Sequence, residues 1–268
     1  MVKIYSHSKL STFEQCRLKF KYRYIDKITV IEKSIEAFLG GIVHNTLEWL
    51  YIQVKNNKLP SIDEIIIYYS TNWQEKYNSN IIIIKKELTI KDYFNKGVEF
   101  LVGYYTKHKP FDDNTLEVEK RVLINLDEFG EYKLIGFVDR LVHNLEKDEY
   151  EIHDYKTANN LPSQEQIEND RQLALYSIAI KDLFGENKEV ILIWHYLAHN
   201  KKISSRRTNK QLEQLKKETL ELIRKIELTT EFPYNKTILC NWCEYKSRCL
   251  AYNEIKEAKN ENRKLDIW

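Results

Sequence analysis

The sequence predicts an α/β fold, in which strands of a central sheet alternate with helices. Segments 134–142, 150–157 and 190–197 have the apolar or alternating patterns of β-strands, and the last is apolar throughout, as in a buried strand. Segment 34–57 instead repeats apolar residues at helical spacing, and helices are also predicted at 163–184 and 208–228. A chain of 268 residues can bury a substantial core as one domain.

The composition is that of an ordinary globular protein, with 43% hydrophobic and 31% charged residues. The sequence contains no apolar run long enough to cross a bilayer, and its first residues lack the apolar region of a signal peptide. We therefore expect a cytoplasmic protein without a membrane partner. The formal net charge is only +2, so any binding of nucleic acid must come from local patches.

Segment 8–28 is predicted to form the N-terminal helix, because Ser11 and Glu14 have the spacing of a capping box at its start. The helix predicted at 34–57 carries His44 on the same side as Glu48. Two adjacent glycines at 40 and 41 cost helix stability, which indicates that another group approaches closely there. A lone helical histidine is usually structural, so the pattern alone does not make His44 a ligand.

Two more helices are predicted at 62–78 and 90–108, as a helical insertion or covering layer within 58–112. A strand follows at 116–126, with Glu117 and Glu119 on one face. Such a pair is more often solvated than functional. Glu119 is nevertheless a candidate for a further acidic group.

The central feature is a predicted β-hairpin at 136–157. A turn centred between Glu146 and Lys147 places Asp139 opposite Asp154, with Cβ atoms about 4.5–5.5 Å apart. Lys156 projects from the same face, since strand side chains repeat every second residue. A carboxylate among the apolar residues of such a strand is costly unless it is paired or metal-bound. The hairpin thus predicts a divalent-metal site, and an ordinary surface ion pair is the alternative.

The helix predicted after the hairpin carries Gln172 and Tyr176, which are four residues apart and so share a face. A basic loop is predicted after the strand at 190–197, and it is either a phosphate-contacting patch or simply solvated. The candidate contacts to nucleic acid are Arg140, Lys201, Lys202, Arg206 and Arg207.

All four cysteines of the chain belong to one further pattern. Cys240, Cys243 and Cys249 are spaced C-x2-C-x5-C, and Cys16 lies in the N-terminal helix. In a cytosolic protein such clustering favours metal binding over disulfides. Tetrahedral zinc and an iron–sulfur cluster use the same ligands, so the spacing alone does not separate them.

Several of these motifs together resemble the PD-(D/E)XK nuclease superfamily. The central match is G-x-x-D-R at 136–140 followed by D-Y-K-T at 154–157. The similarity is greatest to the RecB-like branch, which includes AddB-type nucleases and the iron–sulfur nucleases of CRISPR adaptation. That branch shares the G-x-x-x-H segment ending at His44, the Q-x-x-x-Y motif, and the three late cysteines with one early cysteine. Arg17 departs from the branch, which usually has proline after the early cysteine.

The resemblance implies a restriction-endonuclease-like core, a central mixed sheet flanked by helices, in a single domain spanning 1–268 with 237–250 closing onto the N-terminal helix. The implied activity is metal-dependent hydrolysis of DNA. Lys156 would orient the attacking water or neutralise charge on the phosphate, and Gln172 and Tyr176 would lie beside the site and contact nucleic acid. The implied ligands of Mg²⁺ or Mn²⁺ are His44, Asp139, Asp154 and the carbonyl of Tyr155. The resemblance favours a [4Fe–4S] cluster over Zn²⁺ on Cys16, Cys240, Cys243 and Cys249.

The expected substrate is DNA that is single-stranded or has free ends, cleaved by an exonuclease or flap nuclease in repair, recombination or defence. Which helicase or repair protein would act with it does not follow from the residues. Two alternatives remain. One is a non-catalytic DNA-binding member of the fold, against which the intact D-Y-K motif argues. The other is a zinc-stapled interaction module with an incidental acidic hairpin.

Overall fold

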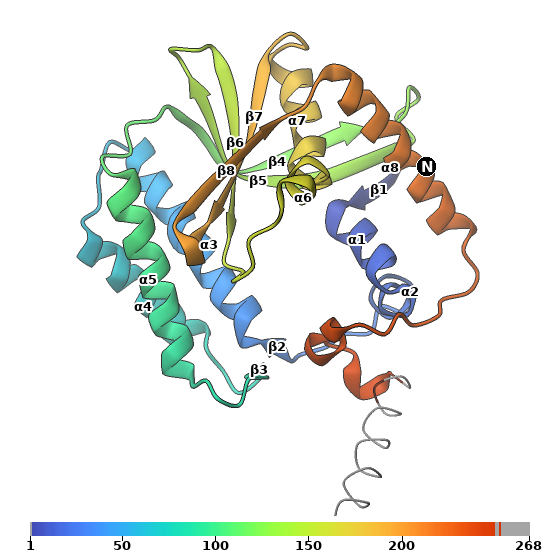
Figure 1. The fold of residues 1–268 in the computed structure, drawn as a ribbon, viewed down its shortest axis with the longest axis horizontal. Coiled ribbons are helices and arrows are strands. Elements are labelled where there is room, and N and C mark those ends of the chain that lie inside the picture. Colours follow the sequence, from blue (N-terminus) through green and yellow to red (C-terminus); the bar gives the residue numbers. More distant parts are fainter. Residues whose placement is uncertain (1, 250–251, 253–268) are drawn as a thin grey trace, which may run out of the picture.

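A mixed six-stranded sheet runs through the part of the chain described by the computed structural model, residues 2–249 and 252 (Figure 1). β1 pairs with β5 and β6 with β7 in parallel, while the other neighbouring strands are antiparallel. This confirms the predicted fold class, a mixed sheet flanked by helices. The strands are β1 (Lys3–Ser6), β4 (Thr115–Asn125), β5 (Tyr132–Asn144), β6 (Glu149–Lys156), β7 (Glu189–Tyr196) and β8 (Lys201–Arg206).

The β5–β6 hairpin has the predicted register, but its two strands separate halfway along. Their ladder ends at the pair Arg140–His153. The first part of β5 pairs instead with β1, up to Ile135, while β4 follows β5 along nearly its whole length. Asp139 and Asp154 therefore lie just beyond the last pair, at a fork between the diverging strands.

One face of the sheet is covered by α1 (His7–Gln15), α7 (Arg171–Phe184) and α8 (Asn209–Leu228), which enclose a core with Leu134, Val138 and Trp194. The prediction of one helix at 163–184 is wrong in one respect: this segment forms two helices, α6 (Gln164–Glu168) and α7. Asp170 begins α7, and its Oδ1 accepts a hydrogen bond of 3.3 Å from the Leu173 amide.

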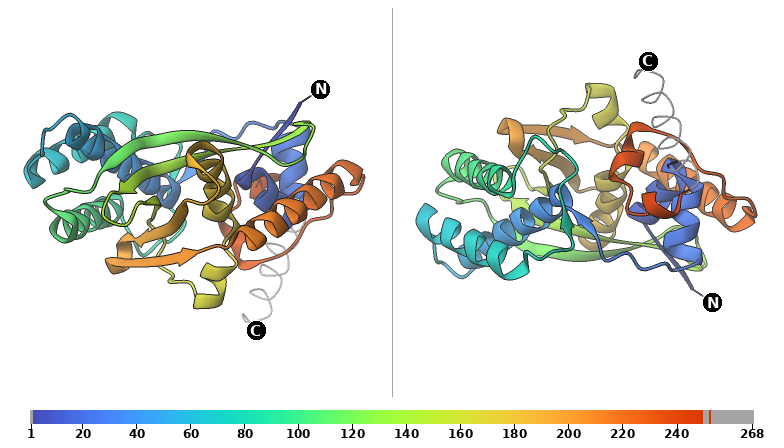
Figure 2. Two further views of the ribbon diagram at one scale, coloured as in Figure 1. Left: turned by 90° about the horizontal axis from the view of Figure 1, so that it is seen from above. Right: turned by 90° about the horizontal axis from the view of Figure 1, so that it is seen from below.

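The opposite face is covered by α3 (Ile35–Lys55), α4 (Ile62–Lys76) and α5 (Ile90–His108), which occupy the predicted helical segments. They form a separate hydrophobic cluster that includes Tyr155 of β6. A short two-stranded sheet, β2 (Lys33–Ser34) with β3 (Ile81–Ile82), joins the ends of this layer. The two groups of helices lie on opposite sides of the molecule (Figure 2).

The N-terminal region differs from its prediction. Strand β1 precedes α1, and the Ser6 hydroxyl caps the helix by accepting from the Lys9 amide. The predicted capping box is therefore wrong: Ser11 lies inside the helix, with its hydroxyl 3.2 Å from His7 Nε2. Helix α1 ends at Cys16, whose backbone is extended, before α2 (Arg17–Phe20) and a π-helical turn at Lys21–Ile25.

The basic segment after β7 is also different, because it forms strand β8 and not a loop. A 3-10 turn at Leu197–His199 reverses the chain, and β8 then pairs with β7 along its length. This pairing separates the cations: Lys201 lies opposite Tyr196, next to the end of β6, whereas Arg206 lies opposite Ile191 near the other end.

After α8 the chain returns to the N-terminal helices. Asn235 Nδ2 donates to the Gln15 carbonyl at 3.0 Å, and two 3-10 turns follow at Ile238–Trp242 and Lys246–Arg248. Position 250 of the predicted cysteine segment, and positions 1, 251 and 253–268 of the predicted domain, lie outside the described residues. None of the helices described for this chain combines the length and apolar character that a membrane crossing requires.

Candidate active site and cysteine cavity

Three side chains from three elements converge beside the fork in the sheet. His44 from α3, Glu119 from β4 and Asp139 from β5 each direct a ligand atom into the same space, with these atoms within 4.8 Å of one another. His44 Nδ1 lies 3.3 Å from Asp139 Oδ2. One imidazole and two carboxylates form a donor set suited to a divalent cation such as Mn²⁺.

The backbone of Tyr155 connects this group to the second half of the hairpin. Its N–H donates to Asp139 Oδ2 at 2.9 Å, and its carbonyl oxygen accepts from His44 Nε2 at 2.7 Å. Both contacts form where β6 no longer pairs with β5. The Asp139 carboxylate therefore accepts the Tyr155 N–H in place of a backbone carbonyl of β5. The Tyr155 carbonyl thus faces the space between His44 and Asp139.

The electrostatics of the group favour a bound cation. Burial, followed by the charges of Asp139 and Glu48, raises the pKa of Glu119 to about 7. Burial and the neighbouring Asp154 charge also raise the pKa of Asp139 well above its usual value. Carboxyl groups that resist ionisation together at neutral pH gain from a cation between them, since it offsets their repulsion.

Glu119 holds an unusual backbone conformation in the middle of β4, with φ of 48°. Non-glycine residues rarely adopt this left-handed region, and the cost persists where the surroundings enforce it, often at functional sites. Val122 belongs to the core beneath α7, whereas Val118 packs against the α3–α5 cluster. In a regular strand Val118 and Val122 would lie on the same face, but here they lie on opposite faces of the sheet. The strand therefore rotates at Glu119, and this rotation turns the Glu119 carboxylate towards His44.

The residues of the D-Y-K motif lie beside this group, since the Tyr155 backbone contacts both His44 and Asp139. Asp154 is only 4% exposed, and its Oδ2 is 2.7 Å from Lys156 Nζ. Burial lowers the pKa of Lys156, but the charges of Asp154, Asp170 and Asp139 together raise it above its usual value. Lys156 is therefore a cation at neutral pH, and its side chain is 31% exposed at the edge of the site.

Helix α7 brings the two residues of the Q-x-x-x-Y motif to this lysine. Gln172 Oε1 accepts from Lys156 Nζ at 3.2 Å. Tyr176 is 5% exposed and packs over Gly136, where an added Cβ would lie 2.1 Å from the tyrosine ring. Tyr176 thus lies beneath the site, and Gly136 is required because the ring occupies the space of a side chain.

The structure also bears on the predictions for α3. A Cβ at Gly40 would lie 3.1 Å from Thr157 Oγ1, which confirms that this glycine permits a close approach. Glu48 lies one turn from His44, but both nitrogens of His44 face Tyr155 and Asp139. The Glu48 carboxylate acts on Glu119, where its charge contributes to the raised pKa.

Arg140 does not contact solvent, so its predicted role in binding nucleic acid is wrong. It is 1% exposed and lies over the ring of Tyr51, which belongs to α3. Its guanidinium donates to the Tyr155 hydroxyl at 3.1 Å and to His153 Nδ1 at 2.8 Å. Arg140 therefore fixes Tyr155 from behind, while the Tyr155 backbone faces the site.

The remaining cations do not form the single patch that the sequence suggested. Arg206 pairs with Glu149 at 2.7 Å and with Glu189 at 3.4 Å. Arg207 donates to the Ile167 carbonyl at 2.8 Å. Only Lys201 and Lys202 lie at the end of β8 nearest Lys156.

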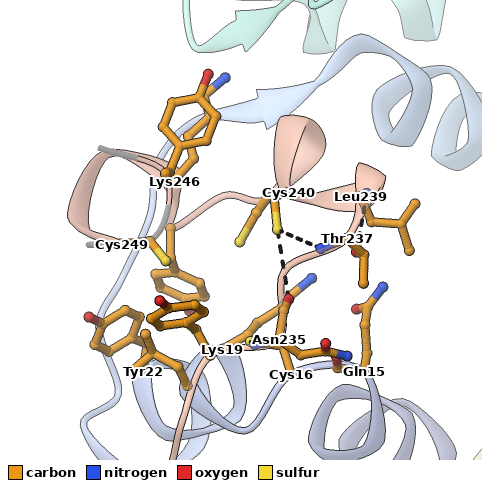
Figure 3. Close-up of a pocket in the computed structure, with 15 residues that line it drawn as sticks. Gln15, Cys16, Lys19, Tyr22, Asn235, Thr237, Leu239, Cys240, Lys246 and Cys249 are labelled. Carbon is orange, nitrogen blue, oxygen red and sulfur yellow. Dashed lines mark hydrogen bonds between the residues drawn. The ribbon is translucent and has the colours of Figure 1, made fainter. Parts of the chain in front are cut away.

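The four cysteines line one cavity of about 50 Å³ (Figure 3). Cys16 reaches it because the helix break places an extended residue between α1 and α2. Two thiols accept backbone N–H donors, Cys16 from Asn235 and Cys240 from Thr237, both at 3.4 Å. Four thiols around a small cavity suit a soft metal or a cluster, and N–H donors to sulfur favour the ionised form that binds metal.

Sequence reasoning did not anticipate that His7 would be partly buried near the charges of Arg171 and Lys156. His7 follows β1 directly, and burial and then the charges of Arg171 and Lys156 lower its pKa to about 4. The four residues Lys3–Ser6 carry too little periodicity to predict the strand, and therefore the position of His7 at its end. His153 and His195, 2.8 Å apart behind the hairpin, were likewise not anticipated.

Among curated proteins, no sequence matches this chain. Several solved structures resemble it, among them the following two. SSO0001 is 13% identical with a TM-score of 0.45, covering 94% of this chain and 89% of its own. A protein from Eubacterium rectale, named provisionally as an exonuclease, is 12% identical with a TM-score of 0.50, and the match covers 88% of this chain and 86% of that protein. At this identity the similarity shows a shared fold. The model of the PD-(D/E)XK nuclease superfamily matches residues 4–250. With this match over nearly its whole length, the chain belongs to the PD-(D/E)XK nuclease superfamily.

Proposed function

We propose that this protein is a metal-dependent DNA nuclease of the RecB-like branch. The observation that carries the proposal is the convergence of His44, Glu119 and Asp139 within 4.8 Å, beside the buried Asp154–Lys156 pair. A non-catalytic member of the fold has no need to hold carboxyl groups whose pKa values are raised by burial and by mutual repulsion. A catalytic site does, because the repulsion is relieved when a metal ion binds.

The metal site would consist of His44, Asp139, Asp154 and the carbonyl oxygen of Tyr155, with Glu119 as a further ligand. A bound Mg²⁺ or Mn²⁺ would lower the pKa of a coordinated water and stabilise negative charge on the phosphate. The imidazole favours Mn²⁺, since nitrogen ligands suit transition metals better than Mg²⁺. Asp139 would also keep the Tyr155 carbonyl in place through its hydrogen bond to the adjacent amide.

Lys156 would act on the scissile phosphate. Its ammonium group is held between Asp154 Oδ2 at 2.7 Å and Gln172 Oε1 at 3.2 Å. In that position it can donate a hydrogen bond to the attacking water or neutralise the charge that develops on the phosphate. Gln172 orients the ammonium, and Tyr176 supports Gln172 from beneath.

The substrate would be DNA that is single-stranded or has a free end. Lys201 and Lys202 are the cations of β8 that lie nearest Lys156, so they are the candidates for contacts to the DNA backbone. We further propose that the chain is one nuclease domain, with 58–112 as a helical insertion. A role in repair, recombination or defence follows from the same branch.

The cysteine cavity would hold a [4Fe–4S] cluster. No three of the four sulfur atoms, all of which belong to described residues, lie within 4.8 Å of one another. In a tetrahedral zinc site the sulfur atoms lie about 3.8 Å from one another, because each Zn–S bond is about 2.3 Å long. The wider spacing favours a polynuclear cluster, and zinc is the alternative. Absorbance near 400 nm in anaerobically purified protein, roughly where iron–thiolate clusters absorb, would distinguish the coloured cluster from colourless zinc.

The nuclease proposal is tested by cleavage of end-labelled DNA. We expect Asp154→Ala and Lys156→Ala to abolish Mg²⁺- or Mn²⁺-dependent cleavage with little change in melting temperature, because both side chains serve the reaction and not the core. His44→Ala should raise the metal concentration for half-maximal rate more than it lowers the saturated rate. Cleavage at the normal rate by both the Asp154 and the Lys156 variants would refute the proposed chemistry.

A further inference from the structure

One part of the sheet has a covered face and an uncovered face. On the covered side Val122, Leu134 and Val138 are at most 2% exposed beneath α7. Along β1, β4 and β5 the side chains between these residues point to the opposite face of the sheet. Its large apolar side chains are unusually exposed: Phe137 by 50%, Ile4 by 50% and Leu123 by 43%. We call this side the open face, and it consists of Ile4, Arg121, Leu123, Lys133, Ile135 and Phe137.

The register makes the open face one continuous strip. Phe137 lies opposite Arg121, and Ile135 lies opposite Leu123 on β4. Ile4 of β1 lies beside Lys133 on the other edge. The strip therefore spans three neighbouring strands, about 10 Å across.

The strip leads directly to the candidate active site. Phe137 precedes Asp139 by two residues, so their side chains are about 7 Å apart along β5. Arg121 follows Glu119 by two residues on β4, and the rotation of the strand at Glu119 turns the Glu119 carboxylate towards His44. The covering layer of α3–α5 begins at this point, since Val118 packs against it and Leu123 is exposed. A ligand on the open face would thus meet His44, Glu119 and Asp139 where the strip ends.

We propose that the open face binds the single-stranded DNA substrate, with a base stacked on Phe137 and phosphates near Arg121 and Lys133. This inference rests on the nuclease function proposed above. The charge supports a polyanion: among the described residues neither Arg121 nor Lys133 forms an ion pair with a carboxylate. Exposed aromatic rings on a sheet, flanked by cations, bind unpaired bases in several nucleic-acid-binding folds.

The same features favour a single strand over a duplex. The ring of Phe137 can stack only on a base whose face is free, and in a duplex both faces are already covered by neighbouring bases. A strip about 10 Å wide also accommodates one chain. Contiguous exposed apolar patches are uncommon on soluble proteins and mark interaction sites, which gives the open face a reason to remain uncovered.

The test measures binding of a fluorescent single-stranded oligonucleotide in chelator, so that no cleavage occurs. We expect Phe137→Ala to weaken binding between about 5-fold and 100-fold, the range for loss of one base–aromatic stack. Phe137→Trp should bind as well as the wild type, whereas Phe137→Leu should be as weak as Phe137→Ala. Arg121→Ala and Lys133→Ala should each reduce the slope of log affinity against log salt by about 0.7.

The matched control is Phe129→Ala, at the tip of the β4–β5 connection. Phe129 is 87% exposed, more than Phe137, but lies beyond the last pair of the ladder. Its substitution should leave binding unchanged. All variants should melt at temperatures close to the wild type, because the substituted side chains are exposed or, at Lys133, only partly buried.

Hydrolysis of bis(p-nitrophenyl) phosphate separates this inference from the nuclease proposal, since that diester is too small to reach the open face from the site. We expect Phe137→Ala to hydrolyse it at the wild-type rate while its KM for single-stranded DNA rises. If Phe137→Ala or Phe137→Leu binds the oligonucleotide as tightly as the wild type, the proposed DNA binding at the open face is wrong, while the nuclease proposal is unaffected. A wild-type protein that cleaves neither substrate would instead overturn the nuclease.

Discussion

Asp139 owes its place in the site to the separation of two strands. Its carboxylate accepts the Tyr155 amide at 2.9 Å and lies 3.3 Å from His44, so it connects β5, β6 and α3 through one side chain. The same position leaves it buried near Asp154, and burial with that charge raises its pKa. The pKa of the neighbouring Glu119 is also raised, to about 7, by burial and by the charge of Asp139.

These pKa values predict how stability depends on pH in the metal-free protein. Both groups hold their protons more tightly in the folded than in the unfolded state, so their contribution is complete at low pH. It is lost as the pH rises through the folded pKa values. We therefore expect the melting temperature in chelator to fall between pH 5 and pH 8.

Glu119→Gln and Asp139→Asn should each flatten this fall, because an amide carries no charge to repel its neighbour. Saturating Mn²⁺ should raise the melting temperature of the wild type more at pH 8 than at pH 5, where protons compete for the ligands. A wild-type melting temperature that is independent of pH and of Mn²⁺ would mean that the carboxylates are not a coupled metal site. Scanning calorimetry at both pH values provides the measurement.

At the scale of elements, the packing of α7 against β5 determines where Gln172 meets Lys156. Tyr176 fits over Gly136 so closely that a Cβ there would lie 2.1 Å from its ring. Since Gln172 and Tyr176 share one face of α7, a displacement of the tyrosine also moves the glutamine.

We expect Gly136→Ala to lower stability by about 1–3 kcal/mol, as overpacking does, and to reduce cleavage by displacing Gln172. Gly103→Ala is the control, because a Cβ there would lie 3.7 Å from Asn200 in ordinary contact. In the middle of α5 it should stabilise the protein by about 1 kcal/mol and leave cleavage unchanged. Urea unfolding with parallel rate measurements decides between these outcomes.

The elements that sequence predicted correctly are those with strong local patterns. The hairpin register followed from the position of one turn, and α3 from a long apolar repeat. The short strand β1 was missed because four residues carry little periodicity, and its absence led to Ser11 being taken as the helix cap in place of Ser6. The strand β8 was mistaken for a loop because its exposed, cationic residues resemble a solvated segment.

The candidate site was predictable only where a motif lies on a regular element. Asp139, Asp154 and His44 could be placed from strand and helix periodicity together with the family resemblance. Arg140 was mistaken for a surface cation, because its burial depends on α3 covering that face of the sheet. The position of Glu119 depends on a left-handed residue within β4, which alternation along a strand cannot reveal.

At the scale of the whole molecule, the cysteine cavity joins the two ends of the described chain. Cys16 comes from the break after α1, and Cys240, Cys243 and Cys249 come from the segment beyond α8. A common metal centre would close almost the entire chain into one loop. By analogy with a covalent cross-link of such length, closure stabilises the fold by about 4–5 kcal/mol.

If the cysteine cavity holds the proposed cluster, Cys16→Ala should lose the iron, lower the melting temperature and reduce the yield of folded protein. Cleavage per folded molecule should remain, since the thiol takes no part in the reaction. The iron content, the melting temperature and the rate per folded molecule are the quantities to measure. A variant that keeps full iron content and normal stability would show that the fourth ligand is another group.

The central claim is that the fork between β5 and β6 is a metal-dependent catalytic site. The most direct test is a time course on end-labelled single-stranded DNA with Mn²⁺ or chelator, for the wild type and Asp139→Asn. We expect the wild type to cleave with Mn²⁺ and not with chelator, and Asp139→Asn to cleave in neither, because an amide cannot neutralise a divalent cation. Cleavage that persists in chelator, or that proceeds at the wild-type rate in Asp139→Asn, would contradict the claim.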